Sequence, residues 1–164
     1  MVDDVSTREA TESTAFILAQ LGFHTSYRFA DALAPLGIGP RQFGTLRLLR
    51  ANNGQTQHQL STTLGIHRNV MVGLVDDLEA RELVERRRHP TDRRAHAVHL
   101  LPAGAELLER AEPLAWALDE SLQESLSRSE RADLRALLDK IVAGQGLTPG
   151  IHPGLRRGAE SSSC

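Results

Sequence analysis

The feature that constrains the fold most is a pair of short helical patterns that meet at Gly65 and lead directly into two strand patterns. Thr56 is a suitable N-cap for a helix over residues 57–64, in which two leucines share one face. After His67 a second pattern runs to about Arg81 with four apolar side chains on one face: Val70, Leu74, Val75 and Leu78. The spacing predicts two short helices joined by a tight turn.

From residue 83 the pattern changes from helical to extended. Residues 83–88 and 95–100 have the composition of strands, and residues 90–92 have that of a turn. Five arginines and a single acidic residue lie between Arg86 and His99, although the formal net charge of the 164 residues is only −2. Because a local patch matters more than the total charge for binding a polyanion, the sequence predicts a basic hairpin that is able to contact one.

Four longer helical patterns surround this central part. We expect helices over residues 10–34 and from Pro40 to about Asn52, and two more over residues 102–126 and 128–143. A capping box from Ser127 to Glu130 starts the last of these. The predicted fold class is mainly α with a small β-hairpin wing, within an ordered domain over residues 10–144. Residues 1–9 are expected to be flexible and residues 145–164 to be disordered.

Composition excludes several classes of protein. No stretch approaches the ~20 apolar residues of a membrane span, and the polar start lacks the features of a signal peptide, so we expect a cytoplasmic protein. The only cysteine is Cys164, which precludes a disulfide within the chain. The sequence contains neither a nucleophile paired with a general base nor a glycine loop that could bind phosphate. We therefore expect neither an enzyme nor a cofactor.

The order of helix, turn, helix and basic hairpin suits duplex DNA, because the second helix can enter the major groove while the hairpin reaches phosphates. Asn69 could pair with adenine, Arg68 with guanine, and Val72 could touch a thymine methyl. The predicted DNA-binding residues on this helix are His67, Arg68, Asn69, Val72 and Gly73, and those on the hairpin are Arg86, Arg87, Arg88, Arg93 and Arg94. The alternatives are a cap-like role for His67, packing for the valines, and an ordinary solvated strand edge for the arginines.

Four segments carry a resemblance to a known family: residues 60–66, 78–84, 90–94 and 100–104. They resemble the MarR family of bacterial regulators, over residues 10–144. The resemblance implies a homodimer of winged helix-turn-helix lobes, each over residues 40–100, with the first helix and the last two at the dimer interface. It also implies that Asp92 braces the wing, and that Arg93 or Arg94 enters the minor groove or clamps a phosphate.

A repressor that binds a pseudo-palindromic operator and is released by a small, aromatic or phenolic ligand is the expected function. The length of the helix over residues 102–126, about 37 Å at ~1.5 Å per residue, supports the dimer, because a lobe of this size cannot cover it. The competing interpretation is a winged-helix module for protein–protein interaction without specific DNA binding.

The sequence offers candidates for a ligand site but none for a metal site. His24, Tyr27 and Arg28 on the first helix, with Trp116, could bind an aromatic carboxylate or phenol. The alternative is that these aromatic side chains belong to the core or to an interface. Among the seven histidines, His96 and His99 lie three apart on a strand and face opposite ways, so no metal is expected.

Overall fold

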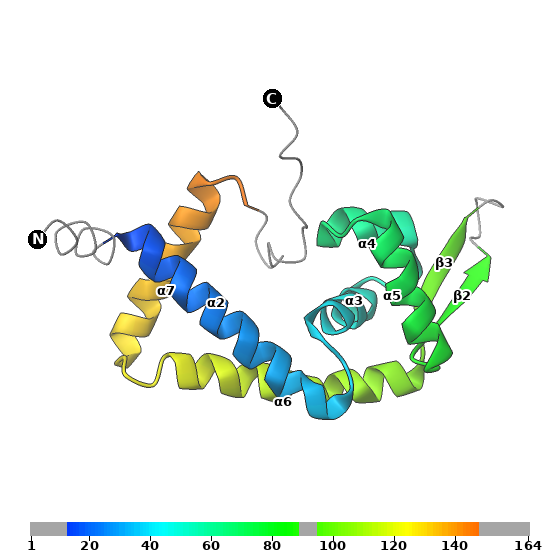
Figure 1. The fold of residues 1–164 in the computed structure, drawn as a ribbon, viewed down its shortest axis with the longest axis horizontal. Helices are drawn as coiled ribbons and strands as arrows, with labels where there is room; N and C mark the ends of the chain where they lie inside the picture. Colours follow the sequence, from blue (N-terminus) through cyan, green and yellow to red (C-terminus); the bar gives the residue numbers. More distant parts are fainter. Residues whose placement is uncertain (1–12, 89–94, 148–164) are drawn as a thin grey trace, which may run out of the picture.

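The computed structural model describes residues 13–88 and 95–147. It confirms the predicted fold class, since helices dominate and a small antiparallel sheet carries the hairpin (Figure 1). The elements in chain order are α2 (Thr14–Leu33), η1 (Ala34–Leu36), α3 (Pro40–Ala51), β1 (Gln55–Thr56), α4 (Gln57–Leu64), α5 (Arg68–Ala80), β2 (Val84–Arg88), β3 (His96–Leu100), α6 (Pro102–Leu122) and α7 (Arg128–Gly144).

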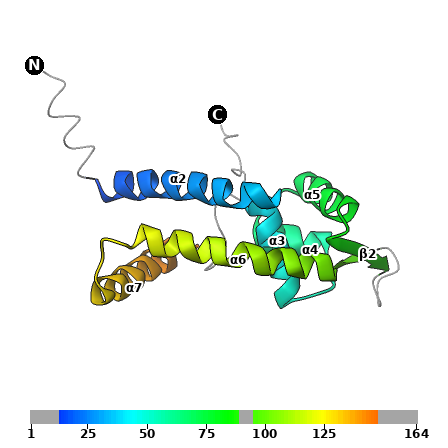
Figure 2. The ribbon, with the colours of Figure 1, turned by 90° about the horizontal axis from the view of Figure 1, so that it is seen from below.

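The molecule consists of a small lobe and a long helical extension. The lobe holds α3, α4, α5 and the sheet, and α6 starts at the base of the hairpin and runs away from it (Figure 1). Figure 2 shows α2 lying over α6, and α7 at the end of α6 that is far from the hairpin. None of the helices within the described ranges is both long and apolar enough to cross a membrane.

The hydrophobic core lies between the lobe helices, the sheet and the first half of α6. Its most deeply buried members include Leu46, Leu49, Leu60, Met71, Leu78, Val84, Val98 and Leu108. On α5 the buried side chains are Met71, Leu74, Val75 and Leu78, whereas Val70 is only partly buried at the edge of the core. The buried face of this helix therefore includes Met71, which the predicted face lacks, and has Val70 only at its edge.

Local capping signals set several of the helix ends as predicted. The Thr56 hydroxyl accepts a hydrogen bond from the Gln59 backbone N–H (3.2 Å), and the Ser127 hydroxyl does the same for Glu130 (3.4 Å). Gly65 ends α4 with a φ of +62°, in the left-handed region that glycine adopts without strain. α6 ends at Leu122 rather than at residue 126, because a turn in which Leu126 N–H bonds the Gln123 carbonyl follows it.

The sheet has the order β1-β3-β2, with all neighbours antiparallel. Arg86 pairs with Val98 across the hairpin, and Gln55 pairs with the same residue from the other side. The two-residue strand β1 is too short to produce a sequence pattern and was not predicted. It fastens the hairpin to the segment between α3 and α4.

Gly104 explains why the resemblance includes a glycine two residues after Pro102. Leu101 N–H donates to the Leu83 carbonyl (3.0 Å), which brings the first turn of α6 against the base of β2. A Cβ on Gly104 would lie 2.8 Å from Leu100 Cδ1 and 3.1 Å from the Leu83 carbonyl carbon, and would overlap the carbonyl oxygen. Only glycine fits at this crossing without displacement of the backbone.

Candidate nucleic-acid interface

The first turn of α5 is capped by a histidine. His67 is the N-cap residue, and its Nδ1 accepts a hydrogen bond from the Asn69 backbone N–H (3.2 Å). This is the cap-like role that the sequence left open for His67. Because Nδ1 is the acceptor, the ring proton is on Nε2 in this arrangement. The imidazole is thus held against the start of the helix.

An exposed face of α5 gathers most of the predicted base-reading residues. Arg68, Asn69, Val72 and Gly73 are all exposed and recur at helical spacing on one side. Val72 is 38% exposed, whereas Val70 packs against the core, so the packing alternative applies to Val70 and not to Val72. No atom lies within 4 Å of the Cβ that could be built on Gly73, which leaves its backbone open to a close approach.

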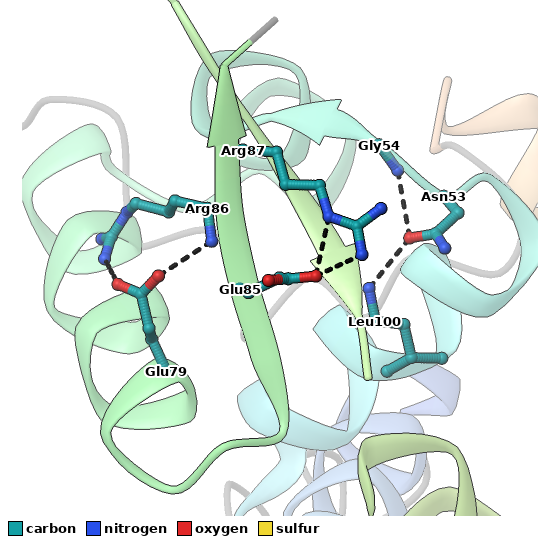
Figure 3. A network of polar contacts seen from close by, with 7 residues as sticks. All are labelled: Asn53, Gly54, Glu79, Glu85, Arg86, Arg87 and Leu100. Atoms are coloured by element: carbon teal, nitrogen blue, oxygen red, sulfur yellow. Dashed lines mark hydrogen bonds and ion pairs between the residues drawn. The ribbon is translucent and has the colours of Figure 1, made fainter. Parts of the chain in front are cut away.

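The second half of the candidate interface is the hairpin, and its first arginine is tied to α5. The Arg86 guanidinium forms ion pairs with both Asp76 and Glu79, and its backbone N–H donates to Glu79 Oε1 (2.8 Å; Figure 3). Burial opposes the charge of Arg86, but the bonds to these two carboxylates outweigh it and hold its pKa above the ordinary value. The side chain is only 20% exposed. The direct DNA contact predicted for Arg86 stays a prediction.

The next two arginines have different surroundings. Arg87 donates from Nε to Glu85 Oε1 (2.7 Å) and forms an ion pair with that carboxylate, on the opposite side of β2 from Arg86 (Figure 3). Arg88 is exposed at the end of the strand. Since side chains alternate along a strand, Arg88 lies on the same side as Arg86. The arginine run therefore divides into three distinct environments.

Three predicted residues, Asp92, Arg93 and Arg94, lie outside the described residues. Their proposed roles at the tip of the hairpin stay predictions. The described part of the hairpin ends at Arg88 and resumes at Ala95.

Sequence reasoning missed a residue that holds the sheet together. The Asn53 side-chain oxygen accepts hydrogen bonds from Leu100 N–H (2.9 Å) and Gly54 N–H (3.1 Å; Figure 3). Gly54 has a φ of +78°, and its N–H also donates to the Val98 carbonyl (3.1 Å). The Asn-Gly pair is a known turn signal, but its partner on β3 lies 47 residues away and is set by the tertiary fold.

The four candidate ligand residues lie on two helices and are exposed. His24, Tyr27 and Arg28 project from α2, where the Tyr27 ring stacks on Phe23 with centroids 6.2 Å apart. Trp116 on α6 is 68% exposed. Within the described ranges, Trp116 makes no ring contact with Tyr27, and the ligand role of the four residues stays a prediction. In the same ranges, no group of three or more His, Cys, Asp or Glu side chains could hold a metal ion.

A second surface is apolar and lies away from the hairpin. Large apolar side chains of α2 and α7 are exposed, with Phe23 at 74% and Leu137 at 58%; the others include Phe16, Leu21, Leu134 and Ile141. Figure 2 shows α7 and the first part of α2 at a distance from the lobe. Large apolar side chains exposed in this number along two helices favour a protein interface.

Comparison with known proteins agrees with this arrangement. A family model described as the MarR family matches residues 36–95. The chain is 31% identical over 138 residues to a putative transcriptional regulatory protein for the hcr operon of Thauera aromatica, covering 79% of this chain and 83% of the relative.

Two solved structures have the same fold and exceed 25% identity. One is the transcriptional repressor CouR bound to a 23-mer DNA duplex, with a TM-score of 0.74, 37% identity, and coverage of 82% of this chain and 95% of CouR. The other is CouR from Rhodococcus jostii RHA1 bound to p-coumaroyl-CoA, with a TM-score of 0.68, 27% identity, and coverage of 80% and 93%. The predicted resemblance is confirmed: the chain belongs to the MarR family of winged-helix, DNA-binding transcription regulators, which are not enzymes.

Proposed function

We propose that this chain is a repressor that binds a pseudo-palindromic operator as a homodimer. The observation that carries the proposal is the exposed α5 face of Arg68, Asn69, Val72 and Gly73, which lies beside the arginine-bearing hairpin in one lobe. A helix of this exposure fits the major groove, and the hairpin is then near phosphates or the adjacent minor groove. The DNA complex of the related repressor CouR supports this placement.

Base reading rests on few side chains. Asn69 suits adenine, Arg68 suits guanine, and Val72 suits the methyl group of thymine. His67 is engaged as the helix cap, so we assign it to holding the first turn in place. Phosphate contacts fall to the exposed Arg88 and to Arg93 and Arg94, with Asp92 as a brace at the tip, and Arg87 contributes less because Glu85 neutralises it.

The dimer is supported by the exposed apolar surface of α2 and α7. Side chains such as Phe16 and Leu137 are exposed in the single chain, and contact with a second copy would remove them from water. A two-fold axis there would place two α5 helices about one DNA turn apart, roughly 34–36 Å, which requires an inverted repeat in the operator.

Release by a small aromatic or phenolic ligand completes the proposal. The candidate groups are cationic and aromatic side chains on α2 and α6, namely His24, Tyr27, Arg28 and Trp116. The related CouR structure with p-coumaroyl-CoA supports a ligand that carries an aromatic acyl group. Since all four side chains are exposed in the single chain, we assign completion of this site to the dimer.

The test is selection of duplexes from a random-sequence DNA pool by the full-length protein. We expect enrichment of an inverted repeat with half-sites one turn apart, and loss of preference at one position in each half-site for Asn69→Ala. Gln145→Ala, which changes an exposed amide beyond α7, is the matched control and should leave the selected sequence unchanged. No enrichment by the unmodified protein would contradict the proposal and would favour a protein–protein module instead.

A further inference from the structure

The three consecutive arginines of β2 have separate roles, although they are adjacent in the sequence. We propose that Arg86 is a positioning residue that holds the hairpin against α5 without touching DNA, and that Arg88 is the arginine of this strand that contacts a phosphate. The inference rests on the proposed DNA binding and assigns different duties within that same interface.

The first argument is the way Arg86 uses its hydrogen-bond donors. Its two terminal nitrogens bond different carboxylates, Asp76 and Glu79, which lie three residues apart on one face of α5. Its backbone N–H also bonds Glu79 (2.8 Å), so strand and side chain are fastened to the same helix. To reach a phosphate, Arg86 would have to give up both ion pairs and leave two carboxylates unpaired close to the DNA backbone, which carries the same charge.

The second argument is the position of Arg86 along the hairpin. The base of β2 is anchored by the buried Leu83 and Val84, and Leu83 N–H bonds the Leu78 carbonyl (3.0 Å). Beyond Arg86 the strand carries only exposed side chains. Arg86 is therefore the contact between β2 and α5 that lies nearest to the exposed end of β2, among the described residues. It sets the angle between the two parts that contact DNA, and this preorganisation lowers the entropy lost on binding.

The third argument concerns the two neighbours of Arg86. Arg87 faces the other side of the strand and is paired with Glu85. Arg88 is on the side of Arg86, one alternation further along, and is exposed. Of the three side chains, Arg88 is thus the one that combines exposure with the same side of the hairpin as α5.

The experiment compares Arg86→Gln, Arg87→Gln and Arg88→Gln by titration of full-length protein into the selected duplex over a range of salt concentrations. Each phosphate contact adds about 0.9 to the slope of log affinity against log salt, so Arg88→Gln should lower the slope by about 1.8 in a dimer. Arg86→Gln should weaken binding about tenfold with the slope unchanged. A fall in slope for Arg86→Gln equal to that of Arg88→Gln would overturn the proposal.

Glu79→Gln separates positioning from simple electrostatics. Removing a negative charge beside DNA should tighten binding if charge alone matters, whereas loss of the tether should weaken it. We expect weaker binding, and no further loss when Glu79→Gln is added to Arg86→Gln. Tighter binding by Glu79→Gln would contradict the assignment.

Two further measurements exclude general damage to the fold. Titration at saturating DNA measures the fraction of protein that is active. The affinity of that active fraction for DNA should still be lower in Arg86→Gln. If it is unchanged, Arg86 only stabilises the fold and the proposal is wrong. In the DNA-free protein, amide exchange over residues 84–88 should accelerate in both the Arg86 and the Glu79 variant. The exchange experiment tests whether Arg86 holds the strand against α5, and it does not depend on DNA. If the unmodified protein selects no DNA, only the proposed function is refuted.

Discussion

Gly104 lies where the first turn of α6 passes over the base of the hairpin, and Gly104→Ala tests how tightly that crossing is packed. The added methyl group would lie 2.8 Å from Leu100 Cδ1 and 3.1 Å from the Leu83 carbonyl carbon, and would overlap the carbonyl oxygen. The Leu100 side chain can rotate away. The Leu83 backbone cannot, because Leu101 N–H bonds the same carbonyl.

The expected cost follows from two opposing effects. Overpacking of this kind destabilises a protein by about 1–3 kcal/mol. Replacing glycine with alanine inside a helix recovers about 0.5–1 kcal/mol, so a net loss of roughly 1–2 kcal/mol is expected. For a chain of this length each 1 kcal/mol lowers the melting temperature by about 2–4 °C, so we expect a decrease of roughly 2–8 °C.

The matched control is Gly73→Ala, which makes the same substitution inside α5. No atom lies within 4 Å of the Cβ that would be added there, so only the gain in helix propensity remains. Thermal unfolding followed by circular dichroism, at one fixed protein concentration, should show Gly104→Ala melting below the unmodified protein and Gly73→Ala above it. A Gly104→Ala variant as stable as the unmodified protein would refute the reasoning. DNA titration of Gly73→Ala separately tests the close backbone approach proposed for this residue.

Three further predictions concern other parts of the molecule. Thr56→Ala removes the cap of α4 and should lower the free energy of unfolding by about 1 kcal/mol in urea denaturation; no change would show that the cap is dispensable. The pKa of Glu112 is lowered chiefly by its hydrogen bond from Arg50, so its contribution to stability is present at neutral pH and is lost as pH falls below the usual glutamate range. Glu112→Gln should remove that part of the dependence of the free energy of unfolding on pH. An identical pH dependence in the variant and the unmodified protein would contradict this expectation. Leu137→Glu should yield monomers in light scattering, whereas Ala132→Glu, on the opposite face of α7, should remain dimeric; if both variants are dimers, α7 is not part of the interface.

Much of the candidate site was predictable because its signals are local. The ends of α4 and α7 follow from the caps Thr56 and Ser127, and the turn between α4 and α5 follows from Gly65. Adjacent residues fix these features through their own hydrogen bonds and backbone preferences. The features can therefore be predicted from a short segment of sequence. The change from helical to strand periodicity near Leu83 could be predicted for the same reason, because it too is a local pattern.

Side chains that look alike in the sequence have partners that depend on the tertiary fold. Three consecutive arginines gave one prediction, yet Arg86 binds Asp76 and Glu79 on α5, while Arg87 pairs with Glu85 on the other side of the strand. β1 likewise exists only because the folded lobe brings residues 55–56 beside β3. An ion pair or a strand pairing depends on which elements meet and at what angle. That geometry is set by packing of the whole core. The helices and strands of the interface can therefore be read from local sequence patterns, whereas the pairing of its charges depends on how those elements pack together.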